Sequence, residues 1–322
     1  MTDPIPSNLH HIKELPEYGI SRAAVAIGVF DGVHRGHQKL LTELLTVSSQ
    51  LDATPVVMTF YPHPRSVLSK NPPTLLYPPE EKVRLLCRYG VKAVITVNFT
   101  RQFAALTPER FLEESLFAGT VPIPAVCVGK HWRFGAKAAG DAGFLERTAA
   151  EKHFRFIAVD ELCMDDGRIV SSTAIREAVG AGDLERAAQM LGRRYSLSGT
   201  VEHGYCNAAE KLAAPTANLR FRDGVLPPCG VYAAVAHLSG NEHFAAAVNI
   251  GTAPTFREEY GEIAPRVEVH LLNGFQGDLY GQEMRLELAG FVRKERKFPD
   301  IPALKKQITE DIIQIRRMLE RS

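Results

Sequence analysis

The feature that most constrains the fold is a change of pattern near residue 183. Before it, short apolar runs alternate with helical patterns, which is typical of repeated βαβ units. After it, short β-rich runs follow one another, separated by Gly, Pro and Asn. A chain of 322 residues is long enough for two domains of ordinary size. We therefore expect two domains of different architecture, residues 1–186 and 187–322.

The first part contains candidate strands rich in Val, Ile or Phe, as strands buried on both faces should be. They are Ala23–Phe30, Pro55–Phe60, Ala93–Asn98, Ala125–Gly129 and Phe154–Val159. Amphipathic stretches between them predict helices over Gly36–Leu51, Pro79–Tyr89 and Thr107–Phe117. This order indicates a mostly parallel, doubly wound, Rossmann-like α/β sheet, which binds ligands at the carboxyl ends of its strands.

The second part indicates an antiparallel β-barrel. Its β-rich runs are residues 196–203, 230–238, 243–250, 266–272 and 283–293. Asp183–Leu191 predicts a short helix before the barrel, and Gly192–Tyr195 a linker. Apolar residues at helical spacing over Ile301–Arg321 predict a long terminal helix that packs across the barrel.

Composition limits the partners and the compartment. The chain has 38 basic and 37 acidic residues, so its net charge does not indicate nucleic acid or a membrane surface as a partner. The 5 cysteines include no Cys-x-x-Cys pair, which favours a reducing compartment over disulfides or a zinc site. There is no apolar run of signal-peptide or membrane-spanning length, so we expect a cytoplasmic protein. Self-association into a homo-oligomer is left open.

The clearest chemical signal is Phe30-Asp31-Gly32-Val33-His34-Arg35-Gly36-His37, which ends a predicted strand and opens a predicted helix. A helix N-terminus presents free N–H groups and partial positive charge to phosphate. Gly32 and Gly36 allow close backbone approach, and the two imidazoles can donate hydrogen bonds to developing phosphate charge. Either histidine alone would be interpreted as a polar surface residue, but the whole block predicts a phosphate site.

A second block, Arg168 to Arg176, contains Ser171-Ser172-Thr173 at a predicted helix start. Three hydroxyls there would by themselves indicate a helix N-cap. With Arg176 one turn further on and the histidine block upstream, we interpret them as a triphosphate clamp.

With these motifs the chain resembles the bacterial bifunctional FAD synthetase family, which joins a riboflavin kinase to an FMN adenylyltransferase. The resemblance covers nearly the whole chain in the right order. In the first half its motifs are Gly28-Val29-Phe30-Asp31-Gly32-Val33-His34-Arg35-Gly36-His37, Pro62-His63-Pro64, Val128-Gly129, Arg133-Phe134-Gly135 and Ser171-Ser172-Thr173-Ala174-Ile175-Arg176. In the second half they are Pro215-Thr216-Ala217-Asn218, Gly230-Val231-Tyr232-Ala233, Asn249-Ile250-Gly251-Thr252, Glu268-Val269-His270 and Leu279-Tyr280-Gly281.

The resemblance implies that the first half is a nucleotidyltransferase domain that converts FMN and ATP to FAD and pyrophosphate. His34, His37 and Arg176 would then hold ATP phosphates during adenylyl transfer, with Mg²⁺ neutralising phosphate charge. Further ATP- and phosphate-binding residues would be Gly28, Phe30, Asp31, Gly32, Gly36, Arg168, Ser171, Ser172 and Thr173. Flavin-binding residues would be Phe60, His63, Arg65, His131 and Phe134. For Phe60 and Phe134, a place in the core is an equally weighted alternative.

For the second half, the resemblance implies a barrel of riboflavin-kinase type that converts riboflavin and ATP to FMN and ADP. Thr216 and Asn218 would hold Mg²⁺ and an ATP phosphate. Glu268 would be the general base that takes the proton of the ribityl hydroxyl. Taken alone, Glu268 would be interpreted as an outward-facing strand residue, with Val267 and Val269 on the other face.

The chain departs from the family pattern at several positions. In the first half, Tyr61 replaces a usually acidic residue, His131 an Asn or Asp, and Trp132 a Phe; these changes bear on flavin binding. In the second half, Asn207–Ala214 replaces a Gly- and Arg-rich loop, and Ala253 replaces an Arg found in many relatives. Alanine in place of glycine at a position that needs a positive φ costs ~1–2 kcal/mol, and its Cβ obstructs the approach of the backbone to phosphate. The altered loop therefore bears on kinase activity.

Four functions follow from these observations. The leading hypothesis is a bifunctional enzyme that converts riboflavin to FMN and FMN to FAD. The second is a monofunctional FMN adenylyltransferase whose barrel binds flavin without phosphorylating it. The third is a non-catalytic flavin-binding regulator, which would not require both phosphate motifs. The fourth is a nucleotidyltransferase for another acceptor, such as pantetheine phosphate or nicotinamide mononucleotide, which the barrel motif disfavours.

Overall fold

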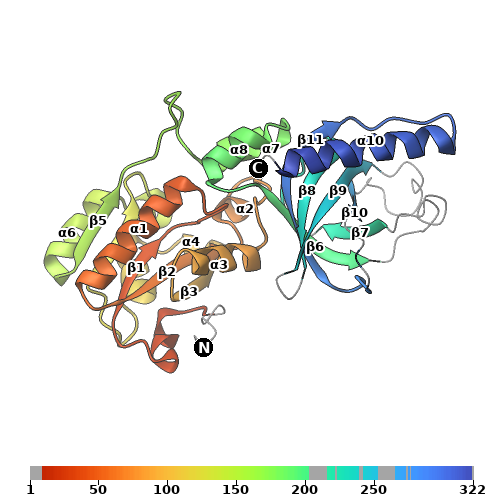
Figure 1. Ribbon diagram of the computed structural model, residues 1–322. Coiled ribbons are helices and arrows are strands. Elements are labelled where there is room, and N and C mark those ends of the chain that lie inside the picture. Colours follow the sequence, from red (N-terminus) through yellow and green to blue (C-terminus); the bar gives the residue numbers. More distant parts are fainter. Residues whose placement is uncertain are drawn as a thin grey trace. The chain divides into compact units, whose positions relative to one another are not determined.

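The computed structural model describes residues 9–202, 216–221, 223–238, 242–252, 265–272, 275 and 277–320. The chain divides into two compact units, Met1–Ser172 and Thr173–Ser322. Figure 1 shows the α/β architecture of the first unit and the β-barrel of the second.

The first unit is built on a parallel five-stranded sheet in the order β3-β2-β1-β4-β5. Its strands are β1 (Ala23–Ile27), β2 (Thr54–Tyr61), β3 (Ala93–Asn98), β4 (Ala125–Gly129) and β5 (Arg155–Val159). The strand order reverses between β1 and β4, so the carboxyl ends of these strands form the switch point at which such sheets bind ligands. The predicted doubly wound sheet is confirmed.

Alternate strand residues supply the two faces of this sheet. Val25, Met58 and Ile95 belong to one core cluster, which also contains residues of the segment after α5 and of α6 (Ala142–Lys152). Helix α1 (Arg35–Gln50) packs on β1, β2, β4 and β5 through a stripe of buried residues that includes Leu40, Leu44 and Val47. Both faces are therefore covered, as the apolar strands require.

Several boundaries differ from the sequence prediction. Strand β1 ends at Ile27, and Phe30, which was expected to end it, has φ 54°, outside the strand region. The helix expected over Thr107–Phe117 is split into α5 (Pro108–Phe111) and a π-helical turn (Leu112–Leu116). Helix α3 (Pro79–Arg88) agrees with its prediction. Elements that were not predicted are the 3₁₀ helices Ile12–Tyr18 and Ala136–Ala138, α2 (Pro64–Leu68), α4 (Arg101–Ala104) and α6.

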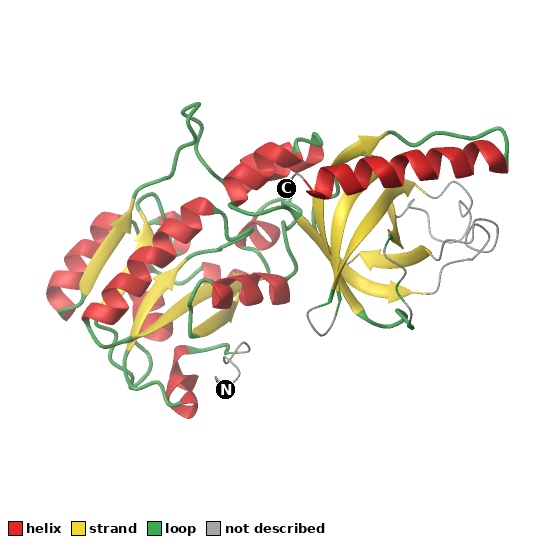
Figure 2. Ribbon diagram, in the orientation of Figure 1, coloured by secondary structure: helices red, strands yellow, loops and turns green. Residues whose placement is uncertain are grey.

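The second unit is a closed antiparallel barrel in the order β10-β7-β6-β11-β8-β9, and Figure 2 shows its strands together with the terminal helix. The strands are β6 (Ser196–Glu202), β7 (Thr216–Phe221), β8 (Gly230–His237), β9 (His243–Thr252), β10 (Pro265–Leu271) and β11 (Glu283–Arg293). Helices α7 (Ser172–Gly180) and α8 (Leu184–Leu191) precede them, and α10 (Ile301–Glu320) follows. The predicted barrel and terminal helix are confirmed; β7 was not predicted, because its motif has few apolar residues.

Contacts within the second unit hold the helices to the barrel. Helix α10 packs on β8, β9 and β11, and its buried Asp311 receives hydrogen bonds from Arg293 Nε at 2.9 and 3.0 Å. The segment expected as a linker ends in a core residue: Tyr195 is 1% exposed, and its hydroxyl bonds to both the N–H and the carbonyl of Val225. No helix within the described ranges is long and apolar enough to cross a membrane.

Candidate active sites

The turn after β1 has a strained backbone. Phe30, Gly32 and Val33 have φ of 54°, 83° and 41°, all in the left-handed region. Such values are rare for a bulky residue and rarer for a β-branched one, and strained residues of this kind gather at functional sites. The strain lets the chain leave the sheet at Gly28 and enter α1 at Arg35 within a few residues.

The two histidines of this turn are stacked. His34 is the N-cap of α1, and its Nδ1 accepts a hydrogen bond from the His37 backbone N–H at 3.4 Å. Because Nδ1 accepts, the neutral His34 ring carries its proton on Nε2 and presents a donor there. The ring centroids of His34 and His37 are 3.6 Å apart, and Phe30 packs 5.1 Å from the His37 ring. A Cβ on Gly36 would lie 3.2 Å from the His34 ring, so this position favours glycine.

Asp31 is tied to the protein on several sides. The residue is 5% exposed, and its Oδ1 accepts from the Leu76 N–H at 3.0 Å. Its carbonyl oxygen accepts from the Ser172 hydroxyl at 2.8 Å. In the structure the carboxylate therefore serves to hold the turn, whereas the sequence assigned Asp31 to phosphate binding.

The second predicted phosphate block is a hairpin followed by α7. Arg168 is on the hairpin, 69% exposed in its side chain and 3.6 Å from Asp166. Val170 bonds back to Leu162, and α7 begins at Ser172. Thr173 and Arg176 are in the first turns of α7 and belong to the second compact unit, while Ser171 and Ser172 belong to the first.

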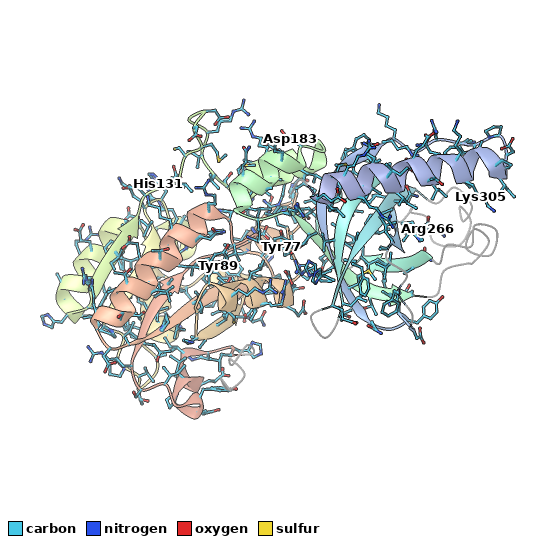
Figure 3. All side chains as sticks on the ribbon, viewed as in Figure 1. Tyr77, Tyr89, His131, Asp183, Arg266 and Lys305 are labelled. Atoms are coloured by element: carbon cyan, nitrogen blue, oxygen red, sulfur yellow. The ribbon has the colours of Figure 1, made fainter. Side chains whose placement is uncertain are left out.

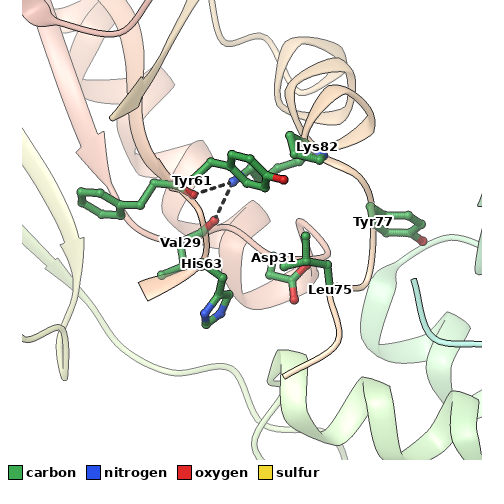
Figure 4. Close-up of a pocket in the computed structure, with 9 residues that line it drawn as sticks. Val29, Asp31, Tyr61, His63, Leu75, Tyr77 and Lys82 are labelled. Carbon is green, nitrogen blue, oxygen red and sulfur yellow. Dashed lines mark hydrogen bonds between the residues drawn. The ribbon is translucent and has the colours of Figure 1, made fainter. Parts of the chain in front are cut away.

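A small pocket, partly open to solvent, lies at the carboxyl ends of β1 and β2 (Figure 4). It is lined by Val29, Asp31, Phe60, Tyr61, His63, Leu75, Tyr77, Pro79 and Lys82. His63 caps α2, with its Nδ1 accepting from the Arg65 N–H at 3.1 Å, and Arg65 itself is exposed. The structure therefore brings the predicted residues His63, Phe60 and Asp31 to one pocket.

Lys82 in this pocket was missed by sequence reasoning. It is 7% exposed and reaches from α3 to the strand ends. Burial lowers the pKa of its amine to about 8, while the charge of Asp31 acts in the opposite direction. A signal was present, because Lys82 lies three and four residues before the buried Leu85 and Leu86, on an otherwise apolar helix stripe.

The two predicted flavin-stacking aromatics are in the core in this structure. Phe60 is 5% exposed and Phe134 is 7% exposed, and both belong to the main core cluster. Trp132 stacks on Phe134 with ring centroids 4.7 Å apart. His131 is exposed on the turn after β4 (Figure 3). The packing of Phe134 fits the core interpretation, whereas Phe60 belongs to the core and also lines the pocket, so its contact with the flavin stays a prediction.

In the barrel, the register brings the kinase motif residues together. Glu268 on β10 lies directly opposite Asn218 on β7 and opposite Asn249 on β9. Residues paired in this way project to the same face of a sheet, with Cβ atoms ~5 Å apart. Val267 and Val269 are buried, so Glu268 is on the outer face, where Arg266 lies 3.3 Å from it. Asn249 was not predicted as a site residue, although its motif was noted.

Thr216 begins β7, two positions before Asn218. The altered loop Asn207–Ala214 and Ala253 lie outside the described residues.

Fold and geometry define the class: an α/β domain of nucleotidyltransferase type followed by a riboflavin-kinase-type barrel. A sequence model of FAD synthetase matches residues 19–174, and one of riboflavin kinase matches residues 191–319. The bifunctional riboflavin kinase/FMN adenylyltransferase of Escherichia coli K12 is 34% identical over 96% of this chain and 95% of its own length. That of Haemophilus influenzae is 36% identical over 90% and 92%. The chain belongs to the bifunctional riboflavin kinase/FMN adenylyltransferase family.

A solved structure from Streptococcus pneumoniae, described as a macrolide-efflux protein, has a similar fold. It has a TM-score of 0.82 and 26% identity, over 97% of this chain and 99% of that one.

Proposed function

We propose that this enzyme makes FAD from riboflavin in two steps, with one step in each half. The barrel phosphorylates riboflavin to FMN, and the α/β domain joins FMN to the adenylyl group of ATP. The observation that carries the proposal is the stacked pair His34 and His37 in the first turn of α1, at the switch point of the sheet. We assign the halves to residues 1–186 and 187–322, since the two family matches leave residues 175–190 between them.

In the adenylyl transfer, an oxygen of the FMN phosphate attacks the α-phosphorus of ATP. The bond from that phosphorus to the bridging oxygen breaks, and pyrophosphate leaves. The Nε2–H of His34, the ring of His37 and the guanidinium of Arg176 stabilise charge that develops on the phosphate oxygens. Ser171, Ser172, Thr173 and Arg168 complete the phosphate site together with the backbone around Gly28, Phe30, Gly32 and Gly36. The flavin binds toward Phe60, His63, Arg65, His131 and Phe134.

In the phosphorylation step, the ribityl hydroxyl oxygen of riboflavin attacks the γ-phosphorus of ATP and ADP leaves. Glu268 accepts the hydroxyl proton, as a general base must lie beside the nucleophile. Asn218 and Glu268 place an amide oxygen and a carboxylate at opposing positions of neighbouring strands, and Mg²⁺ takes oxygen ligands. Bound through Thr216 and Asn218 with the ATP phosphates, Mg²⁺ would neutralise phosphate charge. We place both reactions in a reducing compartment, the cytoplasm, in keeping with the free cysteines of the described residues.

The altered sequence Asn207–Ala214 favours a second candidate, an FMN adenylyltransferase whose barrel binds flavin without phosphorylating it. A carboxylate at Glu210 in a phosphate-binding loop would repel ATP, whereas Lys211 would attract it. Both candidates retain the adenylyl transfer.

Labelled ATP tests the adenylyl transfer directly. With FMN as the flavin, label in the α-phosphate of ATP should appear in FAD, and label in the γ-phosphate should appear only in pyrophosphate. With riboflavin as the flavin, the γ-label should also enter FMN and then FAD. Unlabelled FAD from α-labelled ATP would contradict the proposed reaction, and boiled protein serves as the control.

A further inference from the structure

The Lys82 ammonium group joins the ends of two neighbouring strands. Its Nζ donates to the carbonyl of Val29 at 3.4 Å, to the carbonyl of Phe60 at 3.3 Å and to the hydroxyl of Thr59 at 3.1 Å. Figure 4 shows the Lys82 side chain reaching from α3 to the carbonyl of Val29. These two carbonyls lie just before the turns that carry His34 and His63.

The hydrogen-bond pattern favours the charged form of the amine. The Thr59 hydroxyl donates its hydrogen bond to the Val29 carbonyl at 2.9 Å, so it can only accept a hydrogen bond from Lys82. Lys82 therefore faces three acceptors, and only an ammonium group has three N–H donors. A neutral amine has two N–H donors and would give up one of these three hydrogen bonds, although the Val29 carbonyl would keep the Thr59 hydroxyl as a donor.

The charged groups around the pocket also favour an ammonium group. Asp31, from the turn after β1, is the buried carboxylate whose charge acts on Lys82. Tyr61 and His63 face the pocket from the end of β2, and Tyr77 from the segment before α3. On α3 itself, the neighbouring carboxylate Glu81 is paired with Arg84. Lys82 and Asp31 are thus the opposite charges that the structure buries at this strand edge.

We propose that Lys82 is a positioning residue for adenylyl transfer, whose ammonium group holds the His34 turn and the His63 turn at their working separation. This inference rests on the proposed adenylyltransferase function of the site. Deprotonation of Lys82 removes one of its three hydrogen bonds and the charge that faces Asp31, so the link between the two turns is weakened. A misplacement of about 1 Å can cost on the order of a hundredfold in rate.

The pH dependence separates this role from a purely structural one. Since the pKa of Lys82 is about 8 rather than 10.5, the catalytic rate kcat for FAD formation should fall as the pH rises through about 8. The stability contribution of Lys82 has the opposite sign. Between these two pKa values the unfolded chain binds more protons at this site than the folded one, so this contribution to stability rises with pH. A loss of activity caused by Lys82 is therefore not accompanied by unfolding from the same group.

The test measures kcat and KM for FAD formation from FMN between pH 6.5 and 10 in variants of the full-length protein. Lys82→Met should lower kcat by on the order of tenfold to a hundredfold and abolish the alkaline fall, whereas Lys82→Arg should restore kcat and shift the fall to higher pH. Asp31→Asn keeps an acceptor for Leu76 N–H but removes the charge, so the fall should move to lower pH. Lys92→Met, at an exposed lysine before β3, is the matched control and should behave as the parent.

The results distinguish the inference from the proposed function. FAD formation by the parent enzyme tests the function, and the variants test Lys82. An alkaline fall at the same pH in the parent, Lys82→Arg and Asp31→Asn would overturn the inference. So would a folded Lys82→Met protein with the parent kcat. If Lys82→Met does not fold, Lys82→Arg and Asp31→Asn still test the inference. The pH at which kcat falls should move up in Lys82→Arg and down in Asp31→Asn.

Discussion

Replacing His37 by alanine should lower the rate of FAD formation from FMN by at least about a hundredfold, because removal of one donor to transition-state charge costs on the order of 10²–10³ in rate. The His37 ring stacks on His34 and packs against Phe30, so its position is set by two neighbours. The fold should survive, since α1 keeps its N-cap acceptor: His34 Nδ1 accepts from the backbone N–H of residue 37, which alanine retains.

The His37→Ala experiment has an internal and a matched control. FMN formation from riboflavin by the same protein should be unchanged, because it is assigned to the barrel. His10→Ala, at an exposed histidine of the same unit, should leave both reactions intact. A folded His37→Ala protein that makes FAD at the parent rate would remove the histidine pair from the mechanism.

Replacing Glu268 by glutamine should lower the rate of FMN formation from riboflavin by roughly 10²–10⁴, the usual contribution of a general base. Glutamine keeps the size and the place of the side chain opposite Asn218 and Asn249 but cannot accept the proton at neutral pH. The barrel should stay folded, because the core on the inner face of β10 is made by Val267 and Val269.

In the same Glu268→Gln protein, FAD formation from supplied FMN should remain at the parent rate. Glu283→Gln, at an exposed glutamate on β11, is the matched control and should leave both reactions unchanged. Unchanged FMN formation in Glu268→Gln would show that this carboxylate is not the base, and would return Glu268 to an ordinary outward-facing strand residue.

The sequence predicted those parts of the fold that depend on local pattern. Strands β2, β3 and β4 are continuous apolar runs, and α1 has an apolar stripe at helical spacing. The sequence predicted the bounds of all four elements to within a few residues. Strand β7 was missed because Pro215-Thr216-Ala217-Asn218 has few apolar residues, and its pairing with β6 and β10 is what makes it a strand. The residues of α5 and of the following π-helical turn share one apolar pattern at helical spacing. That pattern does not reveal the change from α-helical to π-helical hydrogen bonding at Leu112.

For the candidate sites, the motifs identified His34 and Glu268 but not the residues that support them. The opposition of Glu268 to Asn218 and Asn249 depends on strand register, which the sequence does not state. Lys82 lies 48 positions after His34 and acts through long-range contacts, so no local spacing connects the two. Only tertiary packing shows that Phe60 belongs to the core cluster and also lines the pocket, so its contact with the flavin stays a prediction.

One chain should carry riboflavin through FMN to FAD. The most direct measurement is chromatographic product analysis of purified protein with ATP and Mg²⁺, given riboflavin in one vessel and FMN in another. We predict FAD in both vessels, with FMN as an intermediate in the first. FAD from the FMN vessel alone would contradict the kinase assignment and favour the monofunctional enzyme. FAD in neither vessel would contradict the assignment of both reactions to this chain.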